Sequence, residues 1–328
     1  MKKSNIAIFV PHLGCKNDCS FCNQRVITGR QAQPAPDDVR RSVETALAYG
    51  GVYEIAFFGG SFTAVDRHYM TALLEAAAPY VDGKTVTGIR ISTRPDAVDE
   101  EVLSVLKFYH VTSVELGAQS MSDRVLRLNG RGHSAQAVRD AACRIRKAGF
   151  SLGLQMMTGL YGDTDAGAIY TAKEFIALHP DTVRIYPTVV LPHTKLAALY
   201  ENGQYVPQTL EEAVALCARL YAMFTQNGIR VIRMGLHAEQ SMQQAKLAGA
   251  YHPAFGELVA SRVLRDRILA YPPGHYRVYI CPGSVSKLVG QKKENIRALE
   301  ALGYHLQIVR DRALQDCDLR LEHVTENA

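Results

Sequence analysis

Short apolar stretches rich in β-branched residues recur along the first two thirds of the chain, and each is followed by apolar residues at helical spacing. The apolar stretches cover residues 6–10, 52–58, 86–91, 113–116, 150–157 and 182–186. The segments with helical spacing cover residues 37–49, 67–78, 100–109, 134–147 and 166–178. This alternation predicts an α/β fold with a parallel sheet, because right-handed helical crossovers join parallel strands. Periodicity alone leaves a full barrel, a partial barrel and an open sheet as alternatives.

The pattern changes after residue 186. A helix is expected over residues 210–225 and one more strand over residues 229–233. A Pro- and Gly-rich break follows at residues 271–274. A small α+β module comes next, with a strand at 276–281, a short helix from 284, a turn at Gly290, a helix at 294–302 and a strand at 305–309. We therefore expect a core at residues 1–235, a linking and helical region at 236–271 and a C-terminal module at 272–328.

Composition narrows the class of protein. The chain has 328 residues, 47% of them hydrophobic and 21% charged, which is typical of a globular protein and excludes a disordered or collagen-like chain. No apolar run approaches the roughly 20 residues that span a bilayer, and the first residues do not form a signal peptide. We expect a cytoplasmic protein without a membrane partner. The net charge of +5 favours an anionic partner only slightly.

Three of the seven cysteines lie within eight positions, directly after the first expected strand. Cys15, Cys19 and Cys22 form a C-x3-C-x2-C pattern. Three thiolates on one short loop can bind three irons of a [4Fe–4S] cluster and leave the fourth iron open to a cofactor or substrate. A structural zinc site is the alternative, and it would need a fourth ligand such as His12.

Polar or glycine residues stand at the C-terminal end of each expected strand. Functional groups gather at these ends in parallel α/β barrels, so the positions are candidates for a binding site. They include Gly59, Gly60 and Ser61 after the second strand, Ser92 in the third, Gln119 in the fourth, Arg131 beyond it and Gln155 in the fifth.

The cysteine triplet, with the aromatic Phe21 before its last member, resembles the signature of the radical S-adenosylmethionine (SAM) enzymes. The resemblance implies a partial (β/α)6 barrel in which Cys15, Cys19 and Cys22 hold a [4Fe–4S] cluster, and an external electron donor reduces that cluster. In that family the cluster cleaves SAM to a 5′-deoxyadenosyl radical. The remaining predicted SAM contacts, implied by the same resemblance, are Phe21, Gly59, Gly60, Ser61, Ser92, Gln119, Arg131 and Gln155.

The strings at residues 59–63, 92–96, 114–120, 131–134 and 184–188 are together most similar to the radical domain of the Elongator catalytic subunits, which modify tRNA. The similarity covers roughly residues 5–235. The cysteine spacing here is more compact, and the residues after 235 are too few for the acetyltransferase domain of that family. The similarity implies RNA, and tRNA above all, as the substrate. The acyl donor, if there is one, is not identified.

The C-terminal module resembles a KH domain, a fold whose G-x-x-G loop contacts a nucleic-acid backbone. Gly290 takes the first glycine position and Lys293 the second. This resemblance implies RNA contacts from Lys287, Gly290, Lys292 and Lys293. A helical hairpin with a solvated basic face is the alternative for this segment.

Two rival functions remain at this stage. One keeps the radical chemistry but acts on a small molecule, as the oxygen-independent coproporphyrinogen oxidases do. The other is a noncatalytic RNA-binding protein whose cysteines hold zinc.

Overall fold

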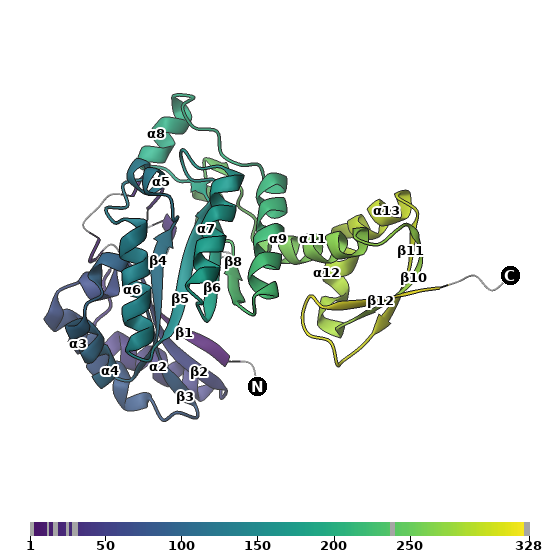
Figure 1. Ribbon diagram of the computed structural model, residues 1–328. Coiled ribbons are helices and arrows are strands. Elements are labelled where there is room, and N and C mark those ends of the chain that lie inside the picture. The colour runs from purple at the N-terminus through teal and green to yellow at the C-terminus, as the bar shows by residue number, and fades with distance from the viewer. Residues whose placement is uncertain are drawn as a thin grey trace.

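The computed structural model describes residues 3–11, 13–15, 19–23, 26–27, 32–236 and 240–324. It has two lobes, a large one built on a parallel sheet and a small C-terminal one (Figure 1). The two lobes meet at helices α9 and α11 (Figure 1).

Seven parallel strands, counted over the described residues, form the sheet of the large lobe in the order β1-β2-β3-β4-β5-β6-β8. They are β1 (Lys3–Val10), β2 (Val52–Gly59), β3 (Val86–Thr93), β4 (Val111–Gln119), β5 (Ser151–Thr158), β6 (Thr182–Pro187) and β8 (Arg230–Met234). The two edge strands β1 and β8 do not pair in this order, so the sheet curls as a partial barrel. Each strand corresponds to a stretch that the sequence predicts, and the α/β partial barrel is confirmed.

Helices cover the outer face of this sheet (Figure 1). They are α2 (Pro36–Ala48), α3 (Arg67–Ala77), α4 (Glu100–Phe108), α5 (Asp123–Leu128), α6 (Ala135–Lys147), α7 (Asp165–Ala177), α8 (Lys195–Glu201) and α9 (Leu210–Gln226). Polar side chains cap several of their first turns. Ser134 accepts a hydrogen bond from the backbone of Ala137 at the start of α6, and Thr209 and Glu212 form a capping box at the start of α9.

A mostly antiparallel pattern is absent from the small lobe, whose sheet is mixed. Its strands are β10 (Gly274–Ile280), β11 (Tyr304–Arg310) and β12 (Leu319–His323), in the order β11-β10-β12. β10 runs parallel to β11 and antiparallel to β12. Two helices, α12 (Val285–Val289) and α13 (Glu294–Ala301), connect β10 to β11. This α+β C-terminal domain was expected from the sequence, except for β12, and its likeness to a KH domain stays a prediction.

Helix α11 (Phe255–Leu269) belongs to the hydrophobic cores of both lobes. Phe255 and Val259 pack in the core of the large lobe, whereas Leu264 and Ile268 pack against the small sheet. A helix that contacts two cores lacks a single apolar stripe, so periodicity did not predict it. The predicted boundary at residue 272 stays a prediction, and the helix before it joins the two lobes.

The remaining elements are short. They are β7 (Val189–Val190), β9 (Ala248–Gly249) and α10 (Gln240–Ala245), and β7 pairs with β9 antiparallel. Together with α5 and α8 they lie in segments that the sequence left as loops, because a few residues carry too little periodicity to predict a helix or a strand. Within the described ranges, no helix combines the length and the apolar character needed to cross a membrane.

The turn between α12 and α13 has a strained backbone. Lys292 and Lys293 have φ values of 49° and 62°, in the left-handed region that favours glycine. We expect Lys293→Gly to raise the free energy of unfolding by about 0.5–1 kcal/mol, because relief of the strain exceeds the entropy that glycine adds to the unfolded chain. Urea denaturation measures this change. Lys293→Ala is the control, because it removes the charge but keeps the Cβ, and an equal gain from alanine would contradict the explanation.

Candidate active site

A cavity of about 190 Å³ opens at the C-terminal ends of the sheet strands. Six of the residues predicted from the sequence line it, namely Phe21, Cys22, Gly59, Ser92, Gln119 and Gln155. Most of the other lining side chains are apolar, with Arg184 and Tyr186 as polar exceptions. The structure therefore brings residues from β2, β3, β4, β5 and the cysteine segment to one cavity.

The backbone of the segment before Cys15 is hydrogen-bonded to the glycine loop after β2. Gly60 N–H donates to the Val10 carbonyl at 2.7 Å, and Ser61 N–H donates to the Leu13 carbonyl at 3.0 Å. A Cβ on Gly60 would lie 2.2 Å from the Leu13 carbonyl oxygen. Glycine is therefore required here for close packing, and the two loops form one unit.

We expect Gly60→Ala to destabilise the protein by about 1–3 kcal/mol, because its methyl group can be accommodated only if backbone atoms move. Urea denaturation gives the loss in the free energy of unfolding. The matched control is Gly283→Ala, since a Cβ at Gly283 would meet no atom within 4 Å. Equal stabilities of the two variants would show that the loops are not locked in this way.

The segment from Cys19 to Cys22 is held from the opposite side by residues that the sequence did not single out. The buried Ser20 hydroxyl donates to Asn129 Oδ1 at 2.7 Å, and the Ser20 backbone N–H donates to the Asn129 carbonyl at 3.1 Å. Asn129 in turn donates to the carbonyls of Val125 and Tyr161, both at 2.9 Å. Neither residue belongs to a motif that reveals chemistry, so only the tertiary structure identifies them as supports of the cysteine segment.

The three thiols are free of disulfides, and Cys15 is exposed while Cys19 and Cys22 are partly buried. Arg131 Nη1 lies 3.1 Å from Cys19 Sγ and donates to it, and Nη2 donates to the Gly117 carbonyl. In the described ranges, no three His, Cys, Asp or Glu side chains are arranged to hold one metal ion. His12, the fourth ligand of the zinc alternative, lies outside the described residues.

Ser61 and Gly60 are not among the residues that line the cavity. The buried Ser61 hydroxyl is within hydrogen-bond distance of the Thr93 hydroxyl, at 3.0 Å, and accepts from Arg94 N–H, also at 3.0 Å. These contacts join the glycine loop to the end of β3. The geometry thus gives Ser61 a positioning contact, and its predicted contact with SAM stays a prediction.

Gln119 and Gln155 differ in how their side chains are satisfied. Gln119 has a φ of 69°, and its Oε1 is buried without a hydrogen-bond partner in the part of the chain that the structure describes. Gln155 Nε2 instead donates to Glu115 at 3.0 Å and to Ser92 at 3.3 Å. Strained backbone and unsatisfied acceptors cluster at binding sites, so Gln119 is the side chain of this cavity that most needs an external donor.

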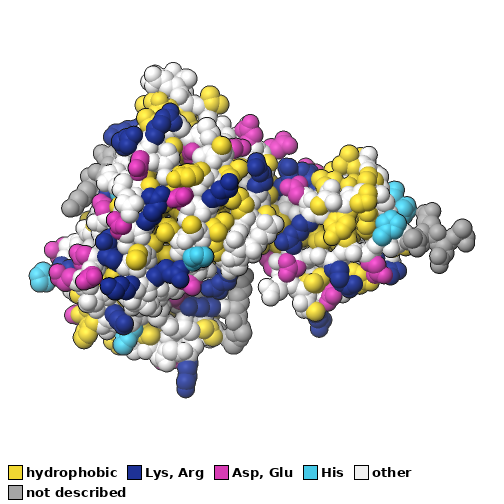
Figure 2. Space-filling view, in the orientation of Figure 1, with side chains coloured by type: hydrophobic (Ala, Val, Ile, Leu, Met, Phe, Trp, Pro, Cys, Tyr) yellow, Lys and Arg dark blue, Asp and Glu magenta, His cyan; other side chains and the backbone are white. Residues whose placement is uncertain are grey.

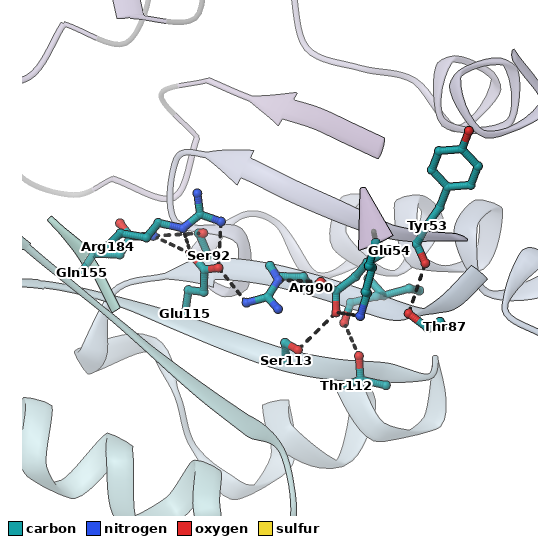
Figure 3. Close-up of polar contacts among 12 residues, drawn as sticks. Tyr53, Glu54, Thr87, Arg90, Ser92, Thr112, Ser113, Glu115, Gln155 and Arg184 are labelled. Atoms are coloured by element: carbon teal, nitrogen blue, oxygen red, sulfur yellow. Dashed lines mark hydrogen bonds and ion pairs between the residues drawn. The ribbon is translucent and has the colours of Figure 1, made fainter. Parts of the chain in front are cut away.

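A network of buried charges lies across the inside of the partial barrel (Figure 3). Arg184 binds Glu115 through two hydrogen bonds of 2.7 and 2.9 Å. Arg90 bridges Glu115 and Glu54 with two hydrogen bonds of 2.7 Å. All four side chains are at most 10% exposed. The network thus joins β2, β3, β4 and β6 beside the cavity.

Charge pairing controls the ionisation of Glu115. Burial alone would raise the pKa of this carboxyl, but Arg184 and Arg90 outweigh burial and hold the pKa below its usual value. Burial raises the pKa of Tyr186, which lines the same cavity, so its phenol is neutral at physiological pH. Arg184 also lies over the Phe58 ring, 4.9 Å from the ring centroid, which fixes the guanidinium between a carboxylate and an aromatic face.

The predicted RNA contacts lie in the small lobe, away from the cavity lining. Lys287 makes an ion pair of 2.7 Å with Asp316, which raises the pKa of the lysine against the opposing effect of burial. Gly290, Lys292 and Lys293 form the turn between α12 and α13. Lys287 is therefore engaged inside the domain, whereas the other two lysines are exposed.

The fold and the cavity define a class of protein, the partial α/β barrels with a cysteine loop after the first strand and a binding cavity at the strand ends. A model of the Radical SAM superfamily matches residues 9–175, and a model of the Radical_SAM C-terminal domain matches residues 180–265. The chain belongs to the radical SAM superfamily.

Curated relatives include proteins with named activities. A tRNA uridine(34) acetyltransferase of Dehalococcoides mccartyi is 24% identical over 66% of this chain and 56% of its own length. Elongator complex protein 3 of Homo sapiens is 29% identical over 52% of this chain and 35% of its own. A protein of Methanocaldococcus jannaschii is 28% identical over 64% of this chain and 63% of its own. The chain thus spans less than two thirds of each of these relatives.

Solved structures share the fold. The archaeal Methanocaldococcus infernus Elp3 superposes with a TM-score of 0.64 and 21% identity, over 81% of this chain and 63% of that chain. Coproporphyrinogen III oxidase (HemN) from Escherichia coli gives a TM-score of 0.51 and 20% identity, over 69% and 53%. At these identities the likeness demonstrates the fold alone.

Proposed function

We propose that the protein is a radical SAM enzyme that modifies RNA, with tRNA as the main candidate. The observation that carries the radical chemistry is the cavity that joins Cys22, the glycine loop and Gln119 at the strand ends. Support for RNA comes from the similarity to a tRNA uridine(34) acetyltransferase and from the exposed lysines of the α12–α13 turn.

The residues present fit the proposed cofactors. Cys15, Cys19 and Cys22 would bind three irons of a [4Fe–4S] cluster, and the Arg131 guanidinium, which already donates to Cys19 Sγ, would stabilise its thiolate. The buried Gln119 Oε1 needs a donor, which a ribose hydroxyl of SAM supplies. When bound, the cluster and SAM would supply a 5′-deoxyadenosyl radical that abstracts hydrogen from the substrate.

The chain's own groups would orient the cofactor and exclude water. Gly59 lines the cavity without a side chain, so backbone atoms can approach the bound group closely. Ser92 and Gln155 are linked by a hydrogen bond of 3.3 Å, and Gln155 is held by Glu115, so both polar groups have fixed directions. The apolar lining, which includes Phe9 and Phe58, keeps bulk water away from reactive species.

An external reductant must supply the electron that the cluster uses. The proposal therefore includes a reducing electron donor and a cytoplasmic location, where thiols stay reduced.

The test is anaerobic reconstitution with iron and sulfide, followed by iron and sulfide analysis and by an assay for 5′-deoxyadenosine after addition of reductant and SAM. We expect about four irons per chain and release of 5′-deoxyadenosine. Zinc without sulfide would overturn the radical enzyme and favour the zinc-binding alternative. Bulk tRNA is then added, and its nucleosides are compared by mass spectrometry before and after turnover. A reaction that responds to coproporphyrinogen and leaves tRNA unchanged would favour the small-molecule alternative.

A further inference from the structure

We propose that an RNA strand lies in a groove between α9, α11 and the α12–α13 turn, and that this groove leads from the turn to the rim of the barrel cavity. The inference rests on the proposed RNA substrate and assigns the surface that positions it. The groove has a volume of about 410 Å³ and takes side chains from both lobes. Figure 2 shows Lys and Arg side chains, with some Asp and Glu among them, where the two lobes meet.

Helix α11 provides a cationic wall of the groove. Arg262 and Arg265 both line it. Arg265 Nε is buried and has no hydrogen-bond partner among the described residues. Arg262 uses its Nε for Asp266, at 2.7 and 3.0 Å. A buried guanidinium nitrogen without an acceptor is costly, and a phosphate oxygen is an acceptor of matching charge and geometry.

The α12–α13 turn ends the groove with two further cations. Gln291 lines the groove, and Lys292 and Lys293 follow it. Both lysines are exposed, and neither forms an ion pair within the described ranges. Their positive φ values hold the turn in a strained conformation, which persists where the surrounding structure fixes it.

Asn295 fixes this turn on α11. Its side-chain nitrogen donates to the Ser261 hydroxyl at 2.7 Å and to the Ser261 carbonyl at 3.1 Å. The same nitrogen donates to the Leu288 carbonyl at 3.2 Å. Because Asn295 is buried and bonded to both α11 and α12, the lysines of the turn keep a constant position relative to Arg262 and Arg265.

The groove and the cavity share a wall at two consecutive residues. Tyr251 packs in a cluster with Val189 and Leu191, and these two residues line the cavity. His252, the next residue, lines the groove. A strand that contacts the turn and passes His252 therefore reaches the cavity rim without crossing the body of either lobe.

Charge also sets the path within the groove. Glu211 and Glu294 line it too, and their carboxylates would repel phosphate. The phosphates are therefore expected on the α11 side, beside Arg262 and Arg265, and the bases toward α9 and α13. An acidic protein segment would also meet the arginines, so the test separates RNA from such a partner.

The experiment measures the affinity of the full-length protein for unfractionated tRNA across a range of salt concentrations. Arg265→Glu/Lys292→Glu/Lys293→Glu is compared with wild type and with Lys84→Glu/Lys147→Glu. Both control lysines are exposed and lie before β3 and β5, at the end of the barrel opposite the cavity. We expect the groove variant to bind more weakly, with a slope of log K against log salt that is shallower by about two, or about 0.7 per lost phosphate contact on a single strand. The control should retain the wild-type slope.

A photo-crosslinking amino acid at position 252 tests the path itself, and we expect it to form an adduct with tRNA that the same group at position 84 does not form. Wild-type binding with an unchanged slope in the groove variant would overturn the groove and leave the RNA substrate standing. Binding by wild type that matches an unrelated polyanion such as heparin would overturn both. Arg265→Gln, which keeps the size of the side chain more closely, replaces Arg265→Glu in the triple variant if thermal unfolding shows that the latter does not fold.

Discussion

Alanine at Cys15, Cys19 or Cys22 is expected to reduce 5′-deoxyadenosine formation to background. Each substitution removes one of three proposed iron ligands, and the chain has no spare thiol nearby to replace it, because the other four cysteines lie at residues 143, 217, 281 and 317. The measurement is the assay for 5′-deoxyadenosine together with iron content after reconstitution. Cys143→Ala is the control, since Cys143 is an exposed thiol on α6. It should keep the wild-type iron content.

Arg131→Ala should give a graded effect rather than a complete one. Its guanidinium contacts Cys19 Sγ but would not itself bind iron. Loss of such an outer contact typically reduces metal affinity or activity about 10–100-fold. Full activity in any of the three cysteine variants would refute the proposed cluster site, whereas wild-type activity in Arg131→Ala would refute only the role of the arginine.

Glu115→Ala is expected to lower the free energy of unfolding by about 3–5 kcal/mol, because it leaves Arg184 and Arg90 buried without their shared carboxylate. Urea denaturation measures the loss. The double variant Glu115→Leu/Arg184→Met should lose less than the sum of the two single changes, since it removes both members of a pair and leaves Arg90 with Glu54. Additive losses would show that the two side chains are not coupled.

The same network predicts a dependence on pH. The pKa of Glu115 is lowered in the folded protein, so its contribution to stability is complete above the usual carboxyl value of 4.5 and is lost as pH falls through the lower, folded value. Glu115→Gln has no group that titrates here. The stability difference between wild type and Glu115→Gln should therefore shrink as the solution is acidified below about pH 4.5. A constant difference over that range would contradict the charge pairing.

The strands and long helices of the barrel were predictable because each carries its own periodicity. β2, for example, is a continuous apolar run that ends at paired glycines, as a strand buried on both faces should. The candidate site was only partly predictable. Gly59, Ser92 and Gln119 follow strands and could be found from position, because strand ends converge in a parallel barrel.

Other features depended on contacts between distant segments. Ser20 and Asn129 are more than a hundred residues apart, and no local pattern relates them. Glu115 and Arg184 are each expensive to bury alone, so a charged residue inside an expected strand indicates a partner but does not identify it. Helix α11 escaped periodicity because its apolar residues face two lobes.

The contact between Asn295 and Ser261 makes α11 a spacer of constant length. Ser261 lies less than two helical turns from Phe255, about 9 Å along the axis at 1.5 Å per residue. A flexible linker would let the two lobes approach one substrate at many separations, whereas a rigid helix allows one. The position of the reacting nucleotide along an RNA would then be measured from the point where the turn grips it. Inserting a helical turn into α11 would shift that position, much as lengthening a caliper arm changes the object that it fits.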